Sequence, residues 1–302
     1  MNTIIHKIKK YLKLFRLKYL KLENFVWKIL NKIKFNRTIF WYPINLLLYL
    51  SLFFIKQKKG KERKEKIVAI VLSWKRVKNI PYVVFGLKKQ SYIDEIIIFH
   101  NHPSKLRIPG CKNIFSEKNL GCIVRHKIAS TIKGYDYFVF SDDDLMLMND
   151  LRKDILPVIR SKGKESVLGF FGQELNMKKN KEEYTSGKHT TSNKEMVPID
   201  IIKGRFHIIS KEGISEMAKS NFNTSSLKSE DDIRANLIIQ RKFKKPSYLI
   251  PLNHRILELH DKHALERRPT HLQKRNEAVS DALKLGWEKQ DYTVKTFEDD
   301  AI

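Results

Sequence analysis

The run Tyr137-Phe138-Val139-Phe140-Ser141-Asp142-Asp143-Asp144-Leu145 decides the fold of this chain. Apolar and aromatic residues end abruptly in three adjacent carboxylates, and apolar character returns at once. This pattern is typical of a buried strand that ends at the edge of a sheet. Carboxylates crowded there repel one another unless a cation binds between them, and oxygen-rich clusters suit hard divalent ions such as Mn²⁺ or Mg²⁺. The alternative is a solvated acidic turn.

Composition allows one large domain with an appendage, because the chain has 302 residues, of which 42% are hydrophobic. The net charge of +26 is unevenly spread: residues 1–66 hold 18 Lys/Arg against three Glu, a balance of +15, which leaves +11 for the rest. Such an excess indicates nucleic acid, an anionic membrane or a solvated face. We favour an anionic membrane and no nucleic acid, because the excess lies beside an apolar segment and no recognised nucleic-acid module is present. Only two cysteines, Cys111 and Cys122, favour a reducing compartment.

The N-terminal 60 residues have the pattern of a membrane-associated segment. Residues 4–33 place apolar side chains at helical spacing with lysines largely on the other face, as in a helix lying in a membrane interface or packed on a partner protein. Thr38 to Ile55 contains no charge, but 18 residues are the lower limit for a span, and Pro43 and Asn45 disfavour a straight one. We predict a shallow or re-entrant anchor on the cytoplasmic face of a bacterial inner membrane, with a single-pass protein as the alternative.

Residues 61–302 alternate predicted strands and helices. Strands are expected at 66–72, 95–100 and 135–141, with helices at 80–89 and 119–133 between them. This order predicts an α/β fold with a parallel-rich sheet covered on both faces. Ligands bind at the carboxyl ends of such strands. Three polar groups follow those ends and should converge: residues 73–76, Asn101, and Asp142 to Asp144.

The pattern loosens after residue 150. Strand-like runs occur at 166–171 and 199–209, and the polar segment 176–193 has the composition of a mobile loop, either a lid or simple disorder. Glu230, Asp231 and Asp232 precede a helical run at 233–240, with Ser229 as the expected N-cap. Acidic residues in a first turn also stabilise a helix through its dipole, which is the structural alternative to a functional role.

Five stretches of residues 67–280, taken in order, resemble a GT-A glycosyltransferase, and most closely the exostosin-like (glycosyltransferase 64-type) domain. They are Leu72 to Arg76, Phe99 to Asn101, Asn119 with Arg125, Ser141 to Asp144, and Glu230 to Asn236, with a weaker match at His271 and Arg275. The resemblance implies a GT-A type nucleotide-diphospho-sugar transferase fold, a Rossmann-like mixed sheet flanked by helices. Glu230 stands where that family usually has a neutral residue, and residues 176–195 match nothing, so the sugar and the acceptor are not carried over.

The resemblance also implies roles for individual residues. Asp144 and Asp142 would hold Mn²⁺ or Mg²⁺, and Asp232, with Asp231, would be the catalytic carboxylate. The implied substrate-binding residues are Ser73, Arg76, Asn101, Asn119, Arg125, Asp142, Asp143, His271 and Arg275. Arginine suits this work because its fork matches phosphate oxygens.

The predicted function is metal-dependent transfer of a hexose or N-acetylhexosamine from a nucleotide-diphosphate donor, UDP in the first place, to a glycan or lipid-linked glycan at a membrane surface. Retention of configuration is favoured. Two alternatives stay open: an inverting GT-A transferase for lipopolysaccharide- or capsule-type glycans, and an inactive membrane-associated adaptor that only binds a sugar nucleotide.

Overall fold

The computed structural model describes residues 37–60, 62–103, 106–178, 181–183, 189–190, 195–220, 230–251, 256–259 and 270–288. The chain divides into two compact units, and the second begins at Leu48. Of the first unit, only residues 37–47 are described, and they belong to helix α2 (Arg37–Phe54). The amphipathic helix predicted for residues 4–33 lies outside the described residues. Among the helices that the structure describes, none combines the length and the apolar character that crossing a bilayer requires.

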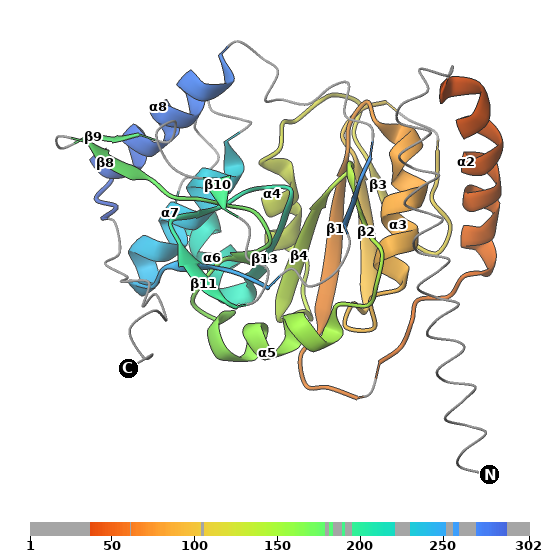
Figure 1. The fold of residues 1–302 in the computed structure, drawn as a ribbon, viewed down its shortest axis with the longest axis horizontal. Coiled ribbons are helices and arrows are strands. Elements are labelled where there is room, and N and C mark those ends of the chain that lie inside the picture. Colours follow the sequence, from red (N-terminus) through yellow and green to blue (C-terminus); the bar gives the residue numbers. More distant parts are fainter. Residues whose placement is uncertain are drawn as a thin grey trace, which may run out of the picture. The chain divides into compact units, whose positions relative to one another are not determined.

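The second unit is built on an eight-stranded mixed sheet with the order β11-β14-β6-β13-β4-β1-β2-β3 (Figure 1). Strand β1 pairs in parallel with β2 and β4, and β2 pairs in parallel with β3. Strand β13 is antiparallel to both β4 and β6, so the sheet changes direction there. The strands are β1 (Ile67–Ser73), β2 (Glu95–His100), β3 (Lys112–Phe115), β4 (Tyr137–Asp142), β6 (Leu168–Gly169), β11 (Val197–Ile199), β13 (Phe206–Ser210) and β14 (Ser247–Leu249).

Strand β1 is the centre of the core because all seven of its residues are buried. Its side chains alternate between two apolar clusters, with Ile67, Ala69 and Val71 on one face and Val68 and Ile70 on the other. Burial on both faces explains why its sequence is a continuous apolar run. The three parallel strands predicted at 66–72, 95–100 and 135–141 are confirmed to within two residues.

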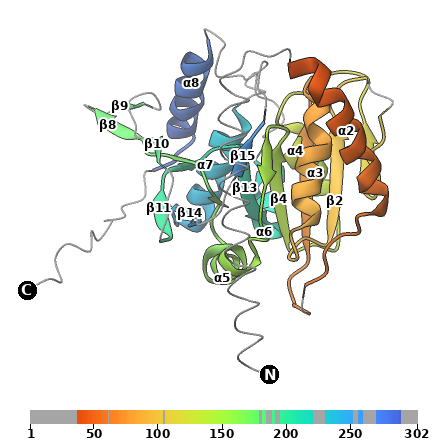
Figure 2. The same cartoon turned by 45° about the vertical axis from the view of Figure 1, so that its right-hand side comes forward.

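Helices cover both faces of this sheet (Figure 2). The second half of α2, with α3 (Ile80–Lys88) and α5 (Arg152–Lys162), packs on one face. The other face is covered by α4 (Val124–Thr131), α6 (Lys211–Lys219) and α7 (Asp231–Phe243). Helix α8 (His271–Lys284) packs against α7, and the short 3-10 helix η1 (Val77–Asn79) precedes α3.

The C-terminal part of α2, from Leu48 on, belongs to the second unit and packs on its core. Leu52 is 1% exposed and lies in the same apolar cluster as α3. The Nζ of Lys88 donates hydrogen bonds to the carbonyls of Leu52 and Ile55, at 2.9 and 2.8 Å. These contacts satisfy carbonyl groups that a helix end otherwise leaves without partners.

The smaller sheets correct one prediction. They are β10-β7-β12, β15-β5 and β8-β9, formed by β5 (Leu145–Leu147), β7 (Gly172–Gln173), β8 (Asn176–Lys178), β9 (Lys181–Glu183), β10 (His189–Thr190), β12 (Ile201–Ile202) and β15 (Ile256–Glu258). Segment 176–193, predicted to be a mobile loop that is either a lid or disordered, contains regular structure among its described residues, because β8 and β9 pair as antiparallel strands; its mobility stays a prediction.

Four predicted elements also differ in their boundaries from the structure. The helix expected from residue 119 begins at Val124, because Asn101 bonds the preceding loop and Gly121 adopts φ +79°. The strand-like runs at 166–171 and 199–209 are each interrupted, the second by a turn at Gly204 between β12 and β13. The N-cap position of α7 is Glu230, not Ser229, and Ser229 itself lies outside the described residues.

Candidate functional site

The carboxyl ends of the parallel strands bring the predicted polar groups to one edge of the sheet. Leu72 of β1 lies opposite Asp142 of β4, and Ser73 lies opposite His100 of β2. Asn101 follows β2 directly, and its backbone N–H donates to the carbonyl of Ser73 at 2.9 Å. The predicted convergence of these groups at one sheet edge is therefore confirmed.

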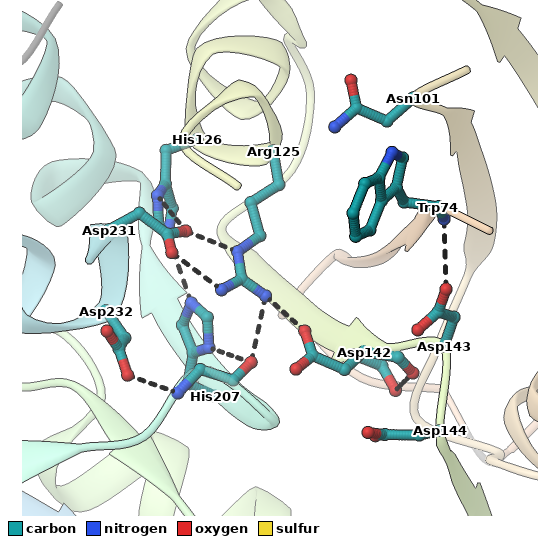
Figure 3. A network of polar contacts seen from close by, with 12 residues as sticks. Trp74, Asn101, Arg125, His126, Asp142, Asp143, Asp144, His207, Asp231 and Asp232 are labelled. Carbon is teal, nitrogen blue, oxygen red and sulfur yellow. Dashed lines mark hydrogen bonds and ion pairs between the residues drawn. The ribbon is translucent and has the colours of Figure 1, made fainter. Parts of the chain in front are cut away.

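The three carboxylates at the end of β4 pair with two arginines. Asp142 Oδ1 accepts from Nη1 of Arg125 at 2.8 Å. Asp143 accepts from the backbone N–H of Trp74 at 3.1 Å and pairs with Nη2 of Arg76 at 2.5 Å. Asp144 Oδ2 accepts from Nη1 of Arg76 at 2.7 Å. Figure 3 shows the three carboxylates side by side at the end of β4. Two arginines therefore offset the repulsion that the sequence predicted.

Asp144 has the features of a ligand for a divalent ion. It is 8% exposed, and its Oδ1 is buried without a hydrogen-bond partner. Within the described residues, no group of three or more His, Cys, Asp or Glu side chains converges as a metal cage would require. Mg²⁺-type sites commonly use one or two carboxylates and take their other ligands from substrate phosphates and water. The residues present therefore fit a divalent ion that binds with a phosphorylated substrate.

Arg125 is the centre of a buried charge network (Figure 3). Its Nε and Nη2 donate to the two oxygens of Asp231 at 2.6 and 3.1 Å, and its Nη1 donates to Asp142 and to the carbonyl of Gly204 at 2.8 and 3.0 Å. The arginine is 3% exposed, and Asp231 is 1% exposed. Helix α4, the first turn of α7 and the end of β4 are thus joined by one side chain.

A second buried ion pair lies next to the first. Asp232 Oδ2 accepts from Nη2 of Arg275 at 2.8 Å and from the backbone N–H of Gly204 at 3.0 Å. Its Oδ1 accepts from the N–H of Ile233 at 2.9 Å. Gly204 therefore contacts both pairs through its backbone. A Cβ built on Gly204 would come within 2.6 Å of Nη2 of Arg125, so only glycine fits between them.

The carboxylates differ in how strongly they hold a proton. Burial raises the pKa of Asp143 to about 7, although Arg76 opposes the shift. Burial also raises the pKa of Asp231, against the opposing charge of Arg125. Burial acts the same way on Asp232, but Arg275, the amide of Gly204 and Arg125 outweigh it and hold its pKa below the usual value. Asp232 therefore stays ionised at neutral pH.

Other predicted residues occupy supporting positions. Nδ2 of Asn101 donates to Oδ1 of Asn119 at 2.8 Å, and Oδ1 of Asn101 accepts from the N–H of Leu120 at 2.7 Å, which braces the loop before α4. Ser73 is buried, and its Oγ makes no hydrogen bond. His271 is the first residue of α8, one turn before Arg275.

Two histidines and Gly204 were not predicted as members of this network. Nε2 of His126 lies 3.1 Å from Nε2 of His207, and Nδ1 of His207 lies 3.3 Å from the carbonyl of Gly204. Nδ1 of His126 lies 3.4 Å from Asp231. Burial lowers the pKa of both histidines well below the usual value, so both are neutral. The sequence offers one signal for this cluster, a glycine that interrupts an otherwise strand-like run.

Comparisons with known proteins agree with the topology. A crystal structure of GalNAc-T7 with UDP, GalNAc and Mn²⁺ matches with a TM-score of 0.53 and 10% sequence identity, covering 75% of this chain and 52% of that chain. This chain therefore spans about half the length of the GalNAc-T7 chain. Two crystal structures of S. aureus TarS, residues 1–349 and a longer chain, match with TM-scores of 0.45 and 0.47 at 15% and 14% identity. They cover 73% of this chain in each case, and 64% and 38% of their own chains.

No protein-family model and no curated protein matches the sequence of this chain. The exostosin-like resemblance therefore stays a prediction. At 10% sequence identity, the structural similarity to GalNAc-T7 shows a shared fold and does not extend to activity or substrate. The mixed sheet and flanking helices of this chain therefore have a GT-A type fold, like that of GalNAc-T7.

Proposed function

We propose that this protein is a glycosyltransferase that takes a sugar from a nucleotide-diphosphate donor. The observation that carries the proposal is the pairing of charges at the carboxyl edge of a GT-A sheet. There Asp142 pairs with Arg125, Asp143 and Asp144 pair with Arg76, and the neighbouring Asp232 pairs with Arg275. Unpaired, such charges are costly to bury, so a fold that gathers them at a ligand-binding edge is suited to a charged substrate.

The proposed donor is a UDP-sugar, and the proposed cofactor is Mn²⁺ or Mg²⁺. The GalNAc-T7 structure contains UDP, GalNAc and Mn²⁺, which supports this choice without extending to the sugar itself. A divalent ion, when bound, would neutralise the diphosphate and assist its departure as a Lewis acid. Asp144 would hold the ion through Oδ1, the carboxylate oxygen that has no other partner.

The remaining residues would position and polarise the donor. Asp231 holds the guanidinium of Arg125 through two hydrogen bonds, and Asp232 holds Arg275, so neither arginine is free to turn away from the site. Groups fixed in advance by neighbouring contacts stabilise a developing charge without a reorganisation cost. In this proposal, the positive charge of both arginines would stabilise the two phosphates of the donor.

Asp232 is the proposed catalytic carboxylate, with Asp231 as its neighbour. Each of its oxygens already accepts a hydrogen bond, so direct action on the sugar or the acceptor requires one of these contacts to open. The ionised state of Asp232 suits either a base in an inverting reaction or stabilisation of a positively charged transition state in a retaining one. The exostosin-like resemblance favours retention, and NMR of the product anomer distinguishes the two.

The test is release of UDP from a panel of UDP-sugars by the full-length protein, with and without Mn²⁺. We expect release from one donor that depends on the metal and is lost in Asp144→Asn. The matched control is Asp136→Asn, which changes an aspartate just before the opposite end of β4, where it pairs with Lys211. Release that persists in Asp144→Asn would contradict the metal assignment. Binding of UDP without turnover of any donor would favour the inactive adaptor.

We also propose that the enzyme works at an anionic membrane surface and takes a glycan or lipid-linked glycan as acceptor. One face of α2 carries five exposed apolar side chains: Leu46, Leu47, Leu50, Phe53 and Phe54. Phe53 and Phe54 are 62% and 84% exposed. Exposed lysines at Lys56 and Lys59 follow directly, which matches an apolar face set into an anionic bilayer beside basic residues at the headgroups.

Vesicle flotation tests this location with full-length protein and vesicles of neutral or partly anionic phospholipid. Phe53→Ser with Phe54→Ser should weaken binding to anionic vesicles about tenfold or more, because two large apolar side chains no longer enter the bilayer. The control Leu272→Ser removes a 54%-exposed leucine from α8 and should bind like the wild type. Unchanged binding of the double variant would refute docking through α2. A dimer that the double variant abolishes would identify a second copy as the occupant of this face.

A further inference from the structure

Arg76 is the cation that lies closest to the acidic cluster. Its two terminal nitrogens reach Asp143 and Asp144 at 2.5 and 2.7 Å, so one guanidinium bridges two neighbouring carboxylates. The side chain of Arg76 is 16% exposed, and those of Asp143 and Asp144 are 3% and 12% exposed. A planar fork that engages two carboxylates at once is a geometry that lysine cannot reproduce.

The backbone before Arg76 is shaped to deliver this side chain. Lys75 adopts φ +61°, one of two positive values among the described residues other than glycine. The N–H of Arg76 donates to the carbonyl of Trp74 at 2.7 Å, which closes a tight turn directly after β1. A left-handed conformation in a residue with a side chain is strained, and such strain is commonly retained where function needs it.

The position of Arg76 conflicts with metal binding at Asp144. Oδ2 of Asp144 is occupied by the guanidinium, while its Oδ1 is buried without a partner. A divalent ion on Oδ1 would lie within a few ångströms of the guanidinium, and like charges at such a distance repel strongly in a poorly hydrated site. The ion and the guanidinium therefore compete for the same carboxylates.

We propose that Arg76 is a resident cation of the divalent-ion site. It neutralises Asp143 and Asp144 while the site holds no metal, moves away from Asp144 when the ion binds, and then donates to phosphate oxygens of the donor. The inference rests on the proposed function, since it assigns a part in metal loading and donor binding to one residue of that site. In this role, Arg76 stabilises the acidic cluster in the absence of metal. Binding of the ion then releases the guanidinium of Arg76 to bind phosphate.

Opposite effects on two ligands distinguish this role from that of a structural ion pair. Removing Arg76 takes away the competitor for the metal, so Mn²⁺ alone should bind more tightly. The same change removes a donor to the diphosphate, so UDP should bind less tightly once Mn²⁺ is saturating. A purely structural arginine would weaken both or neither.

The experiment measures Mn²⁺ binding by electron paramagnetic resonance of the free ion, using full-length Arg76→Gln without nucleotide. We expect binding about tenfold tighter than in the wild type, the scale of one unit charge removed from beside a divalent ion. Calorimetry with UDP at saturating Mn²⁺ should show about tenfold weaker binding, as expected for one lost charge-assisted contact. In the control Arg160→Gln, the arginine removed donates two hydrogen bonds to Glu65, a residue just before β1. This control should leave the affinities for Mn²⁺ and UDP unchanged.

Thermal unfolding shows whether the variant is folded. Without metal, Arg76→Gln should melt below the wild type, since two buried carboxylates lose their partner, and saturating Mn²⁺ should close that gap. Arg76→Lys keeps the charge without the fork and should bind Mn²⁺ with intermediate affinity. The proposal would be overturned if Arg76→Gln and Arg76→Lys both bound Mn²⁺ as tightly as the wild type or less tightly. It would also be overturned if neither the wild type nor the variants bound Mn²⁺. Failure of the proposed function would instead appear as absent turnover of UDP-sugars by the wild type.

Discussion

Replacing Arg125 with lysine tests whether the buried charge network holds the site together. The guanidinium donates four hydrogen bonds, two to Asp231, one to Asp142 and one to the carbonyl of Gly204. Lysine keeps the charge but reaches only part of this set, so at least one buried acceptor is left without a donor. Breaking a buried ion pair typically costs about 3–5 kcal/mol, and we expect the lower end because the charge is kept.

A loss of about 3 kcal/mol corresponds to a fall in Tm of roughly 6–12 °C for a domain of this size. Urea unfolding followed by circular dichroism at pH 7 measures the free energy, and a thermal melt checks it. The matched control is Arg160→Lys, which changes an exposed arginine with an equally forked contact to Glu65 and should have little effect. If Arg125→Lys unfolds within about 1 kcal/mol of the wild type, the network does not carry the stability assigned to it.

Three further predictions concern the neighbourhood of this network. Gly204→Ala should lower the free energy of unfolding, measured in urea, by about 1–3 kcal/mol, because the added Cβ would come within 2.6 Å of the fixed guanidinium of Arg125. A variant as stable as the wild type would show that the arginine can move aside. The folded pKa of Asp232 lies below its usual value of 3.8, so the ionised carboxylate stabilises the fold above about pH 4, and that contribution is lost as the pH falls through the lowered pKa. The stability difference between the wild type and Asp232→Asn should therefore shrink on acidification below pH 4, and a constant difference would contradict this. Lys88→Met should lower the free energy of unfolding by about 1–3 kcal/mol, because two carbonyls at the end of α2 lose their donor. The rate of amide hydrogen exchange should rise more in α2 than elsewhere.

The sequence predicted the parallel part of the sheet because its strands are continuous apolar runs. All of β1 and residues 138–141 of β4 are buried, and this burial requires continuous apolar runs such as Ile67 to Leu72. From the parallel order alone it follows that Ser73, Asn101 and Asp142 meet at one edge. The strand-like runs predicted at 166–171 and 199–209 contain β6 and β12, but the short extents of these strands could not be predicted, since two residues carry no periodicity.

The partners of the site residues could not be predicted from spacing. Arg125 and Asp231 are 106 positions apart, and Asp232 and Arg275 are 43 apart, so their contacts depend on how α4, α7 and α8 pack. The start of α4 was misjudged for a related reason. Asn101, far away in the sequence, binds the loop at Gly121 and delays the helix to Val124.

The long separation between Arg125 and Asp231 has a consequence for the newly made chain. Synthesis at roughly 5–20 residues per second means that about 5–20 s pass between the two residues. During that interval, the helix that carries Arg125 has no Asp231 to pair with, and Arg275 for Asp232 arrives later still. Arg125 therefore cannot gain its full set of partners until the second half of the sheet has emerged, so the charge network at the carboxyl edge forms as one of the last steps of folding.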